Sequence, residues 1–332
     1  MWMAPSLGEA ALVFLAGAAA CFFIGRTAIK QLARVQFVAP VRYKDCPPLL
    51  AYQEKKPRVP TLGGLFLLTA AVIVAACWGG LHHQDGWLVL ASIVALGGMG
   101  LFDDLLKFRG KNALGLRTAP KLLIALLVGG GLGTAMAMKS GIDRALHVPG
   151  LSQNIDVGWG WVPLAMFVVA GSSHAVNLTD GMDGLAAGCL AIAFIAVGLW
   201  INGTEGHDRA LVSWCAALAG ACVGFLWFNS FPASIYMGDV GALGLGAALA
   251  SLSIFSHAAL WLVIIGGIFV AEAVSVILQV GSYKWRNKRR VFRVAPIHHH
   301  FHLGGIAEPK LIVRFWIVGV LLAVLSLTAG AR

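Results

Sequence analysis

Long apolar runs separated by short polar stretches dominate the pattern of this chain. A helix needs about 20 mostly apolar residues to cross the hydrocarbon core of a bilayer. The runs predict spans at 9–25, 62–80, 87–102, 119–138, 160–177, 184–202, 209–228, 240–255, 257–280 and 312–330. The third, fifth and eighth are short for a full crossing. We therefore expect an all-α, polytopic membrane bundle of about ten helices, forming a single domain over residues 1–332.

Composition supports this class and excludes several others. The chain is 58% hydrophobic and 12% charged, whereas soluble domains have about 25% charged residues. Its six cysteines include no CxxC pair, so neither a disulfide framework nor a zinc site is expected. The first 25 residues contain Glu9 but no lysine or arginine. A cleavable signal begins with positive charge, so we interpret the first run as a retained span.

Lysine and arginine are distributed unevenly between the two sides of the predicted bundle. Eight lie in 26–61, five in 103–121 and eight in 281–314, which makes 21 of the 25. The other side has Lys139, Arg144, Arg209 and Arg332. Cytoplasmic loops are the positive ones, so the 21 are expected inside and both termini outside, in the periplasm. The same cations could attract anionic membrane lipid and anionic substrates.

Aspartates gather at the predicted cytoplasmic ends of the spans. Asp103 and Asp104 precede Lys107 by four and three residues, so a continuing helix would place them on one face. This is either an ordinary salt bridge at a helix end or, because adjacent carboxylates repel without a cation, a metal or proton-acceptor site. Asp239 lies between glycines at a helix start, either as a simple N-cap or as a metal- and anion-binding position.

Two polar segments have both structural and functional interpretations. Asn177-Leu178-Thr179-Asp180-Gly181-Met182-Asp183-Gly184 could be a tight turn. Alternatively, its spacing of three could place Asn177, Asp180 and Asp183 on one helical face. Glu272, Ser275, Gln279 and Ser282 are spaced as one polar stripe, which either joins helices or faces substrate.

The string Ala295-Pro296-Ile297-His298-His299-His300-Phe301 is the rarest in the chain. Zinc sites normally use spaced ligands, and adjacent histidines point in different directions. A metal bound by all three is therefore not expected. Hydrogen bonding to phosphate or proton transfer is the better interpretation, with a plain interfacial loop as the alternative.

Taken together, these strings resemble the polyprenyl-phosphate N-acetylhexosamine-1-phosphate transferases, in the branch that uses a muramoyl-pentapeptide substrate. The matching strings include Pro60-Thr61-Leu62-Gly63-Gly64, Met237-Gly238-Asp239, Glu308-Pro309-Lys310 and Arg314-Phe315-Trp316, in family order over residues 56–316. The histidine string is the most specific. The resemblance implies that undecaprenyl phosphate attacks UDP-MurNAc-pentapeptide, that UMP leaves and lipid I forms, and that Mg²⁺ is required. It also implies a homodimer in the bacterial inner membrane with a cytoplasmic site, and no nucleic-acid partner.

The resemblance also implies roles for individual residues. Asp239 would hold Mg²⁺, with Asp183 as a second candidate, and Asp103 or Asp104 would activate the lipid phosphate. His298 is expected to act in catalysis. The implied substrate-binding residues are Lys56, Thr61, Lys107, Lys121, Asn177, Asp180, Asp183, Gly184, Asn229, Tyr236, Gln279, His299 and His300. They lie in or beside the loops 26–61, 103–121, 178–183, 229–239 and 281–311.

Some positions depart from the family pattern. Val240 and Ala242 stand where the family has threonine and serine, which removes two hydroxyls near the expected metal. Three alternatives remain: a sister enzyme that transfers GlcNAc-1-phosphate, an ion-coupled transporter, and an inactive lipid-binding relative. The histidine string argues against the first. Transporters place their acids near the bilayer midplane, whereas here only Glu272 lies well inside a span.

Overall fold

The computed structural model describes residues 7–35, 37, 46–56, 59–109, 115–140, 144–151, 154–203 and 208–330. Within them the chain is helical apart from a two-stranded antiparallel sheet of β1 (Ala145–Leu146) and β2 (Ile155–Asp156). Of the cations that predicted orientation, Arg42, Lys44, Arg58, Lys111 and Arg332 lie outside the described residues, as does the side chain of Lys55.

Eight helical segments among the described residues are long and apolar enough to cross a membrane. They are α1 (Leu7–Arg34), α4 (Gln84–Phe108), α5 (Thr118–Ala137), α6 (Trp161–Thr179, preceded by the 3₁₀ turn Gly158–Gly160), α7 (Leu185–Asn202), α8 (Arg209–Asn229), α9 (Gly238–Phe255) and α13 (Glu308–Gly330). The all-α membrane class is therefore confirmed. The predicted span 87–102 looked short because its helix continues through Asp103, Asp104 and Lys107 to Phe108.

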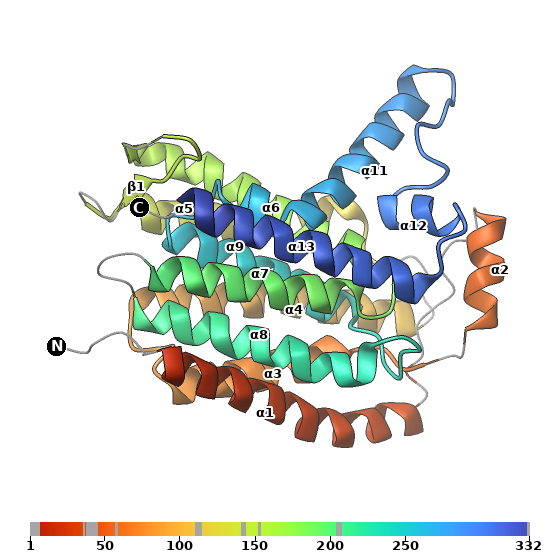
Figure 1. Ribbon diagram of the computed structural model, residues 1–332, viewed down its shortest axis with the longest axis horizontal. Helices are drawn as coiled ribbons and strands as arrows, with labels where there is room; N and C mark the ends of the chain where they lie inside the picture. Colours follow the sequence, from red (N-terminus) through yellow and green to blue (C-terminus); the bar gives the residue numbers. More distant parts are fainter. Residues whose placement is uncertain are drawn as a thin grey trace.

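Two of the ten predicted spans have a different form. The run 62–80 becomes α3 (Gly63–Cys77), which has 15 residues. The run 257–280 was expected as one helix, but it divides into α10 (Leu262–Ile265) and α11 (Gly267–Trp285). Gly266 and Gly267 meet at the break, and glycine is the weakest helix former after proline. Figure 1 shows α11 extending away from the bundle, after which the chain turns back to α12 (Ile297–His302).

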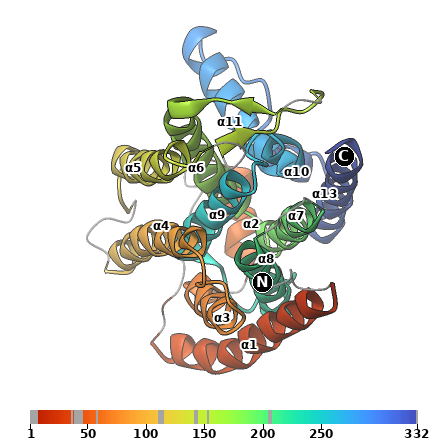
Figure 2. The ribbon, with the colours of Figure 1, turned by 90° about the vertical axis from the view of Figure 1, so that its left-hand side faces the viewer.

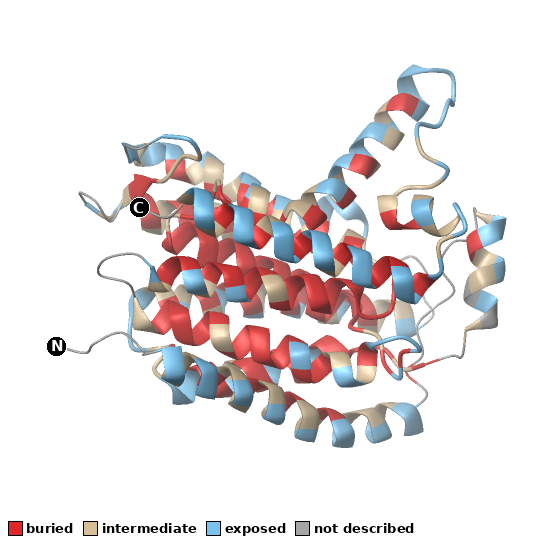
Figure 3. Ribbon diagram, viewed as in Figure 1, coloured by how far each residue is buried: buried red, intermediate tan, exposed pale blue. Residues whose placement is uncertain are grey.

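Helix α9 is the centre of the bundle, and every one of its residues is buried. Figure 2 shows it surrounded by neighbouring helices, while Figure 3 shows exposure concentrated on outer helices such as α1 and α13. Small residues permit this packing, because they let backbones approach closely. A Cβ on Gly64 would lie 2.1 Å from Cα of Gly241, and one on Gly100 would lie 2.3 Å from the carbonyl oxygen of Asp239. The same packing brings the end of α4 against the start of α9.

Helices α2 (Pro47–Lys55) and α12 lie at one end of the bundle, while α1 begins and α13 ends at the other (Figure 1). The polar turns between α6 and α7 and between α8 and α9 also lie at the first end, which is where the predicted site residues gather.

Candidate functional site

Three buried aspartates and two lysines form a compact cluster where α4, α5 and α9 meet. Lys107 Nζ lies 2.6 Å from Asp103, 3.6 Å from Asp104 and 3.2 Å from Asp239. Lys121 Nζ lies 2.7 Å from Asp103 and 2.6 Å from Asp239, so it joins α5 to the other two helices. The expected pairing of Asp103 and Asp104 with Lys107 on one helical face is confirmed.

The cluster also holds the ends of its helices in place. Asp103 Oδ1 accepts a hydrogen bond from the backbone amide of Leu116, which precedes α5. Asp104 Oδ2 accepts one from the amide of Val240 at 3.1 Å. The departure at position 240 therefore leaves this backbone contact in place, and the Val240 side chain is buried in the core of α9.

The donor set of the cluster fits a hard divalent cation. One oxygen from each of Asp103, Asp104 and Asp239 lies within 4.8 Å of the other two, and carboxylate oxygens are the ligands that Mg²⁺ prefers. Three carboxylates and two ammonium groups leave an excess of one negative charge. A divalent cation would reverse that excess and make the cluster attractive to phosphate.

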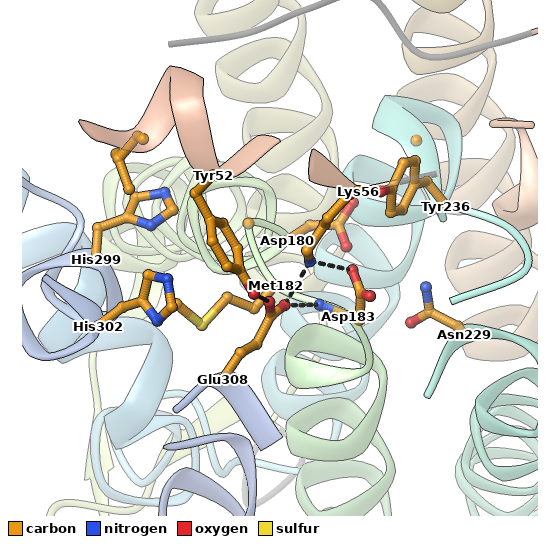
Figure 4. Close-up of a pocket in the computed structure, with 13 residues that line it drawn as sticks. Tyr52, Lys56, Asp180, Met182, Asp183, Asn229, Tyr236, His299, His302 and Glu308 are labelled. Carbon is orange, nitrogen blue, oxygen red and sulfur yellow. Dashed lines mark hydrogen bonds and ion pairs between the residues drawn. The ribbon is translucent and has the colours of Figure 1, made fainter. Parts of the chain in front are cut away.

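A pocket of about 750 Å³, including its open mouth, lies beside the cluster and meets it at Gly238. Its lining residues come from α2, the turn 180–183, the α8–α9 connection, α12 and the start of α13. Six predicted site residues line it: Lys56, Asp180, Asp183, Asn229, Tyr236 and His299. Figure 4 shows their side chains around one space.

The two aspartates of the 177–184 segment enter the pocket through a turn. Helix α6 ends at Thr179, so the interpretation of this segment as a turn is confirmed, and the alternative of a single helical face for Asn177, Asp180 and Asp183 is wrong. The two glycines allow the chain to leave the helix, and Gly184 adopts a φ of 80° at the start of α7, a conformation that glycine takes at little cost. Asp183 Oδ2 accepts from the amide of Ala233 at 3.0 Å, which ties the turn to the α8–α9 connection.

Lys56 stands between two buried carboxylates at one side of the pocket. Its Nζ donates to Asp183 Oδ1 at 2.9 Å and to Glu308 Oε1 at 2.8 Å. Glu308 also accepts from Tyr52 OH and from the amide of Asp183. Burial raises the pKa of Tyr52, and the bond to Glu308 and its charge raise it further, so the hydroxyl remains a neutral donor.

The histidines of α12 have separate environments. His298 is fully buried with its Nδ1 3.0 Å from Glu272 Oε2, so the polar stripe on α11 does lead to the histidines as expected. His299 lines the pocket, and burial is the main cause that lowers its pKa to about 2. It is therefore a neutral imidazole at physiological pH. His300 Nδ1 accepts from the amide of Arg293 at 3.1 Å. None of the three belongs to the metal-ligand group found among the described residues.

Other predicted site residues support the surrounding backbone. Gln279 Oε1 accepts from the amides of Val291 and Phe292, so it holds the segment that leads to α12. Asn229 Oδ1 accepts from the amide of Gly184 at 3.0 Å. Thr61 is buried, and a Cβ added to Gly238 would lie 3.0 Å from its hydroxyl oxygen. Asn177 is partly buried near the end of α6.

Sequence reasoning did not place Tyr52, Met182, His302 or Glu308 in the site, yet all four line the pocket. Glu308 belongs to the matching string Glu308-Pro309-Lys310. It was not assigned to the site, because an acid in the first turn of a helix is common for structural reasons alone. The signal that distinguishes it is burial, since its exposed fraction is 1%, and acids are almost never buried without partners.

Comparison with known proteins gives a consistent result. Residues 86–257 match the model of glycosyl transferase family 4. A protein of Thermodesulfovibrio yellowstonii is 45% identical over 289 residues, covering 82% of this chain and 80% of the relative. A protein of Pelobacter propionicus is 41% identical over 323 residues, which cover 93% of this chain and 88% of the relative. A protein of Citrifermentans bemidjiense is 40% identical over 322 residues, which cover 92% of this chain and 88% of the relative. Each of these relatives is named a phospho-N-acetylmuramoyl-pentapeptide-transferase.

Proposed function

This chain belongs to the phospho-N-acetylmuramoyl-pentapeptide transferases of glycosyl transferase family 4, and we propose that its carboxylate–lysine cluster and adjoining pocket perform that family's reaction. The enzyme transfers phospho-MurNAc-pentapeptide from UDP-MurNAc-pentapeptide to undecaprenyl phosphate. An oxygen of the lipid phosphate forms a bond to the phosphorus attached to the sugar. The bond from that phosphorus to the oxygen bridging to UMP breaks, UMP leaves with the electron pair, and lipid I is the other product.

One observation supports this assignment most strongly. Three carboxylates with oxygens within 4.8 Å of one another adjoin an open pocket lined by charged and polar side chains. Phosphoryl transfer depends on alignment and charge neutralisation more than on covalent help from the protein. A cluster of acids and lysines beside an open polar pocket supplies both requirements at one place.

Within the cluster we assign separate roles. Asp239, with Asp103 and Asp104, would hold Mg²⁺, which when bound would neutralise charge on the diphosphate. Asp103 accepts from both lysines and from the Leu116 amide, so we assign it to fixing the ammonium groups. Asp104 then activates the lipid phosphate. Lys107 and Lys121 contact phosphate, which each can attract as a point charge.

The pocket is assigned to the water-soluble substrate. Asp180 and Asp183 present carboxylate oxygens there, and Asn229 and Tyr236 add polar groups. Carboxylates accept hydrogen bonds from hydroxyl and imide groups, so they suit a nucleoside better than a phosphate. The phosphates would extend past Gly238 toward the two lysines.

We also propose that the site faces the cytoplasm of a bacterial cell, with ten spans, periplasmic termini and a homodimer. The orientation is supported by the positive-inside rule and by the position of α2 and α12, which belong to the cation-rich segments 26–61 and 281–314, together at one end of the bundle (Figure 1). The dimer is supported by family membership.

The function is tested by UMP release from the purified protein in detergent micelles. UMP should appear only when UDP-MurNAc-pentapeptide, undecaprenyl phosphate and Mg²⁺ are all present. UDP-GlcNAc should release none, and release of UMP from UDP-GlcNAc instead would assign the chain to the sister transferases.

A further inference from the structure

Glu308 is a buried residue of the pocket whose contacts join separate parts of the chain. It begins α13 and is 1% exposed. Its carboxylate accepts from Lys56 Nζ at 2.8 Å, from the Asp183 amide at 3.0 Å and from Tyr52 OH. Figure 4 shows these donors converging on it from α2, the residue that follows α2 and the 180–183 turn. Three donors on one buried carboxylate fix its position.

The contact with Lys56 sets the position of a cation at the mouth of the pocket. Lys56 directly follows α2. Its Nζ lies 5.4 Å from the ring centroid of Tyr52 and 5.6 Å from that of Phe231. Two carboxylates and two rings therefore define one place for this ammonium group. Without Glu308, Asp183 would be the remaining carboxylate that holds it.

The contact with the Asp183 amide orders the turn that lines the pocket. The amide of Asp183 points to Glu308, while its carboxylate bonds Lys56 and the amide of Ala233. The backbone at 183 is thus fixed on two sides. Because Asp180 and Gly181 belong to the same turn and line the pocket, their positions depend on this anchor.

The contact with Tyr52 draws α2 over the pocket. The Tyr52 ring packs edge-on against His302 with centroids 4.4 Å apart, so α2 is joined to both α12 and α13. Leu49, also on α2, lines the pocket and is 2% exposed. A short helix of nine residues has little stability alone, so its position depends on such contacts.

We propose that Glu308 is a positioning residue for the nucleoside diphosphate substrate, acting through Lys56, the 180–183 turn and α2. The inference rests on the proposed function and goes beyond it by assigning a role to a residue outside the reacting groups. Glu308 lies with the pocket and not among the aspartates of the metal-ligand group. Its loss should therefore affect the soluble substrate and spare the lipid substrate.

The test compares Glu308→Gln with Glu54→Gln, a matched change at an exposed position on α2. Losing a hydrogen bond to a charged group corresponds to about 10- to 150-fold in affinity. We expect Glu308→Gln to raise the KM for UDP-MurNAc-pentapeptide by about that factor, with the KM for undecaprenyl phosphate changed less than about twofold. Glu54→Gln should change neither KM. Tyr52→Phe, which keeps the ring and removes one donor, should raise the first KM by a smaller factor.

A double-mutant cycle separates positioning from general damage. If Glu308 acts through Lys56, Glu308→Gln should add little to the KM of a Lys56→Gln variant. The proposal would be overturned if the two substitutions had additive effects on the KM for UDP-MurNAc-pentapeptide. It would also be overturned by a raised KM for undecaprenyl phosphate, or by a lower kcat with both KM values unchanged. Calorimetric titration with UDP needs no turnover, so it tests Glu308 even in an inactive protein. Failure of the wild-type enzyme to release UMP would instead refute the proposed function.

Discussion

The buried pair of Glu272 and His298 allows a sharp prediction about catalysis. Both side chains have an exposed fraction of 0%. Glu272 Oε2 lies 3.0 Å from Nδ1 of His298, within ion-pair distance but without hydrogen-bond geometry, and it accepts a hydrogen bond from the backbone amide of His298 at 3.4 Å. On the other side of the ring, a Cβ added to Gly181 would lie 2.4 Å from Nε2. A small rotation of the ring would direct a proton on Nδ1 to Glu272 and present Nε2 as an acceptor toward the pocket-lining turn.

Glu272→Gln keeps the size of the side chain and removes its charge. A hydrogen bond to a charged group contributes about 1.5–3 kcal/mol, which corresponds to about 10- to 150-fold. We expect UMP release to fall by that factor, because the amide no longer fixes the tautomer of His298. Far larger losses are known when an orienting carboxylate is replaced by its amide, so the lower end of the range is a firm minimum.

The assay is UMP release at saturating Mg²⁺, with Ser253→Ala as control for loss of a buried polar group. The Ser253 hydroxyl bonds only the Leu249 carbonyl of its own helix among the described contacts, so this change should leave the rate unaffected. In a His298→Ala background, adding Glu272→Gln should lower the rate of UMP release only a little further. A Glu272→Gln enzyme as fast as the wild type, beside an impaired His298→Ala enzyme, would refute the reasoning.

Three further predictions follow from other parts of the molecule. Asp239→Asn should abolish most Mg²⁺-dependent turnover without unfolding the protein, because it removes charge and keeps shape; near wild-type turnover at limiting Mg²⁺ would exclude Asp239 as an essential ligand. In a variant with serine at Cys46 and Cys77, a cysteine placed at 84 should react with impermeant thiol reagents outside the cell and one at 288 should not, and labelling at 288 in sealed cells would overturn the orientation. Because the pKa of His299 falls to about 2 from an ordinary value of 6.5, the unfolded chain binds a proton below pH 6.5 that the folded protein does not. The Tm should therefore fall as the pH drops from 7 to 5, less steeply in His299→Gln, and equal slopes would contradict the burial of a neutral ring.

The sequence by itself predicted the features that depend on local pattern. The apolar runs located the membrane helices, because crossing hydrocarbon requires length and hydrophobicity within one segment. Helical periodicity placed Asp103 and Asp104 beside Lys107, and it placed Glu272 on a stripe leading to His298. Each of these relations spans a few residues or repeats along one helix, so the order of residues specifies it directly.

Only the tertiary structure decided which distant groups meet. Tyr52 and Glu308 are 256 positions apart, and no periodicity relates them. Lys121 joins Asp103 to Asp239 because small residues let the helices of the bundle pack closely around α9. Local pattern specifies which segments are helices, whereas close packing, burial and the pairing of buried charges select the partners that form the site.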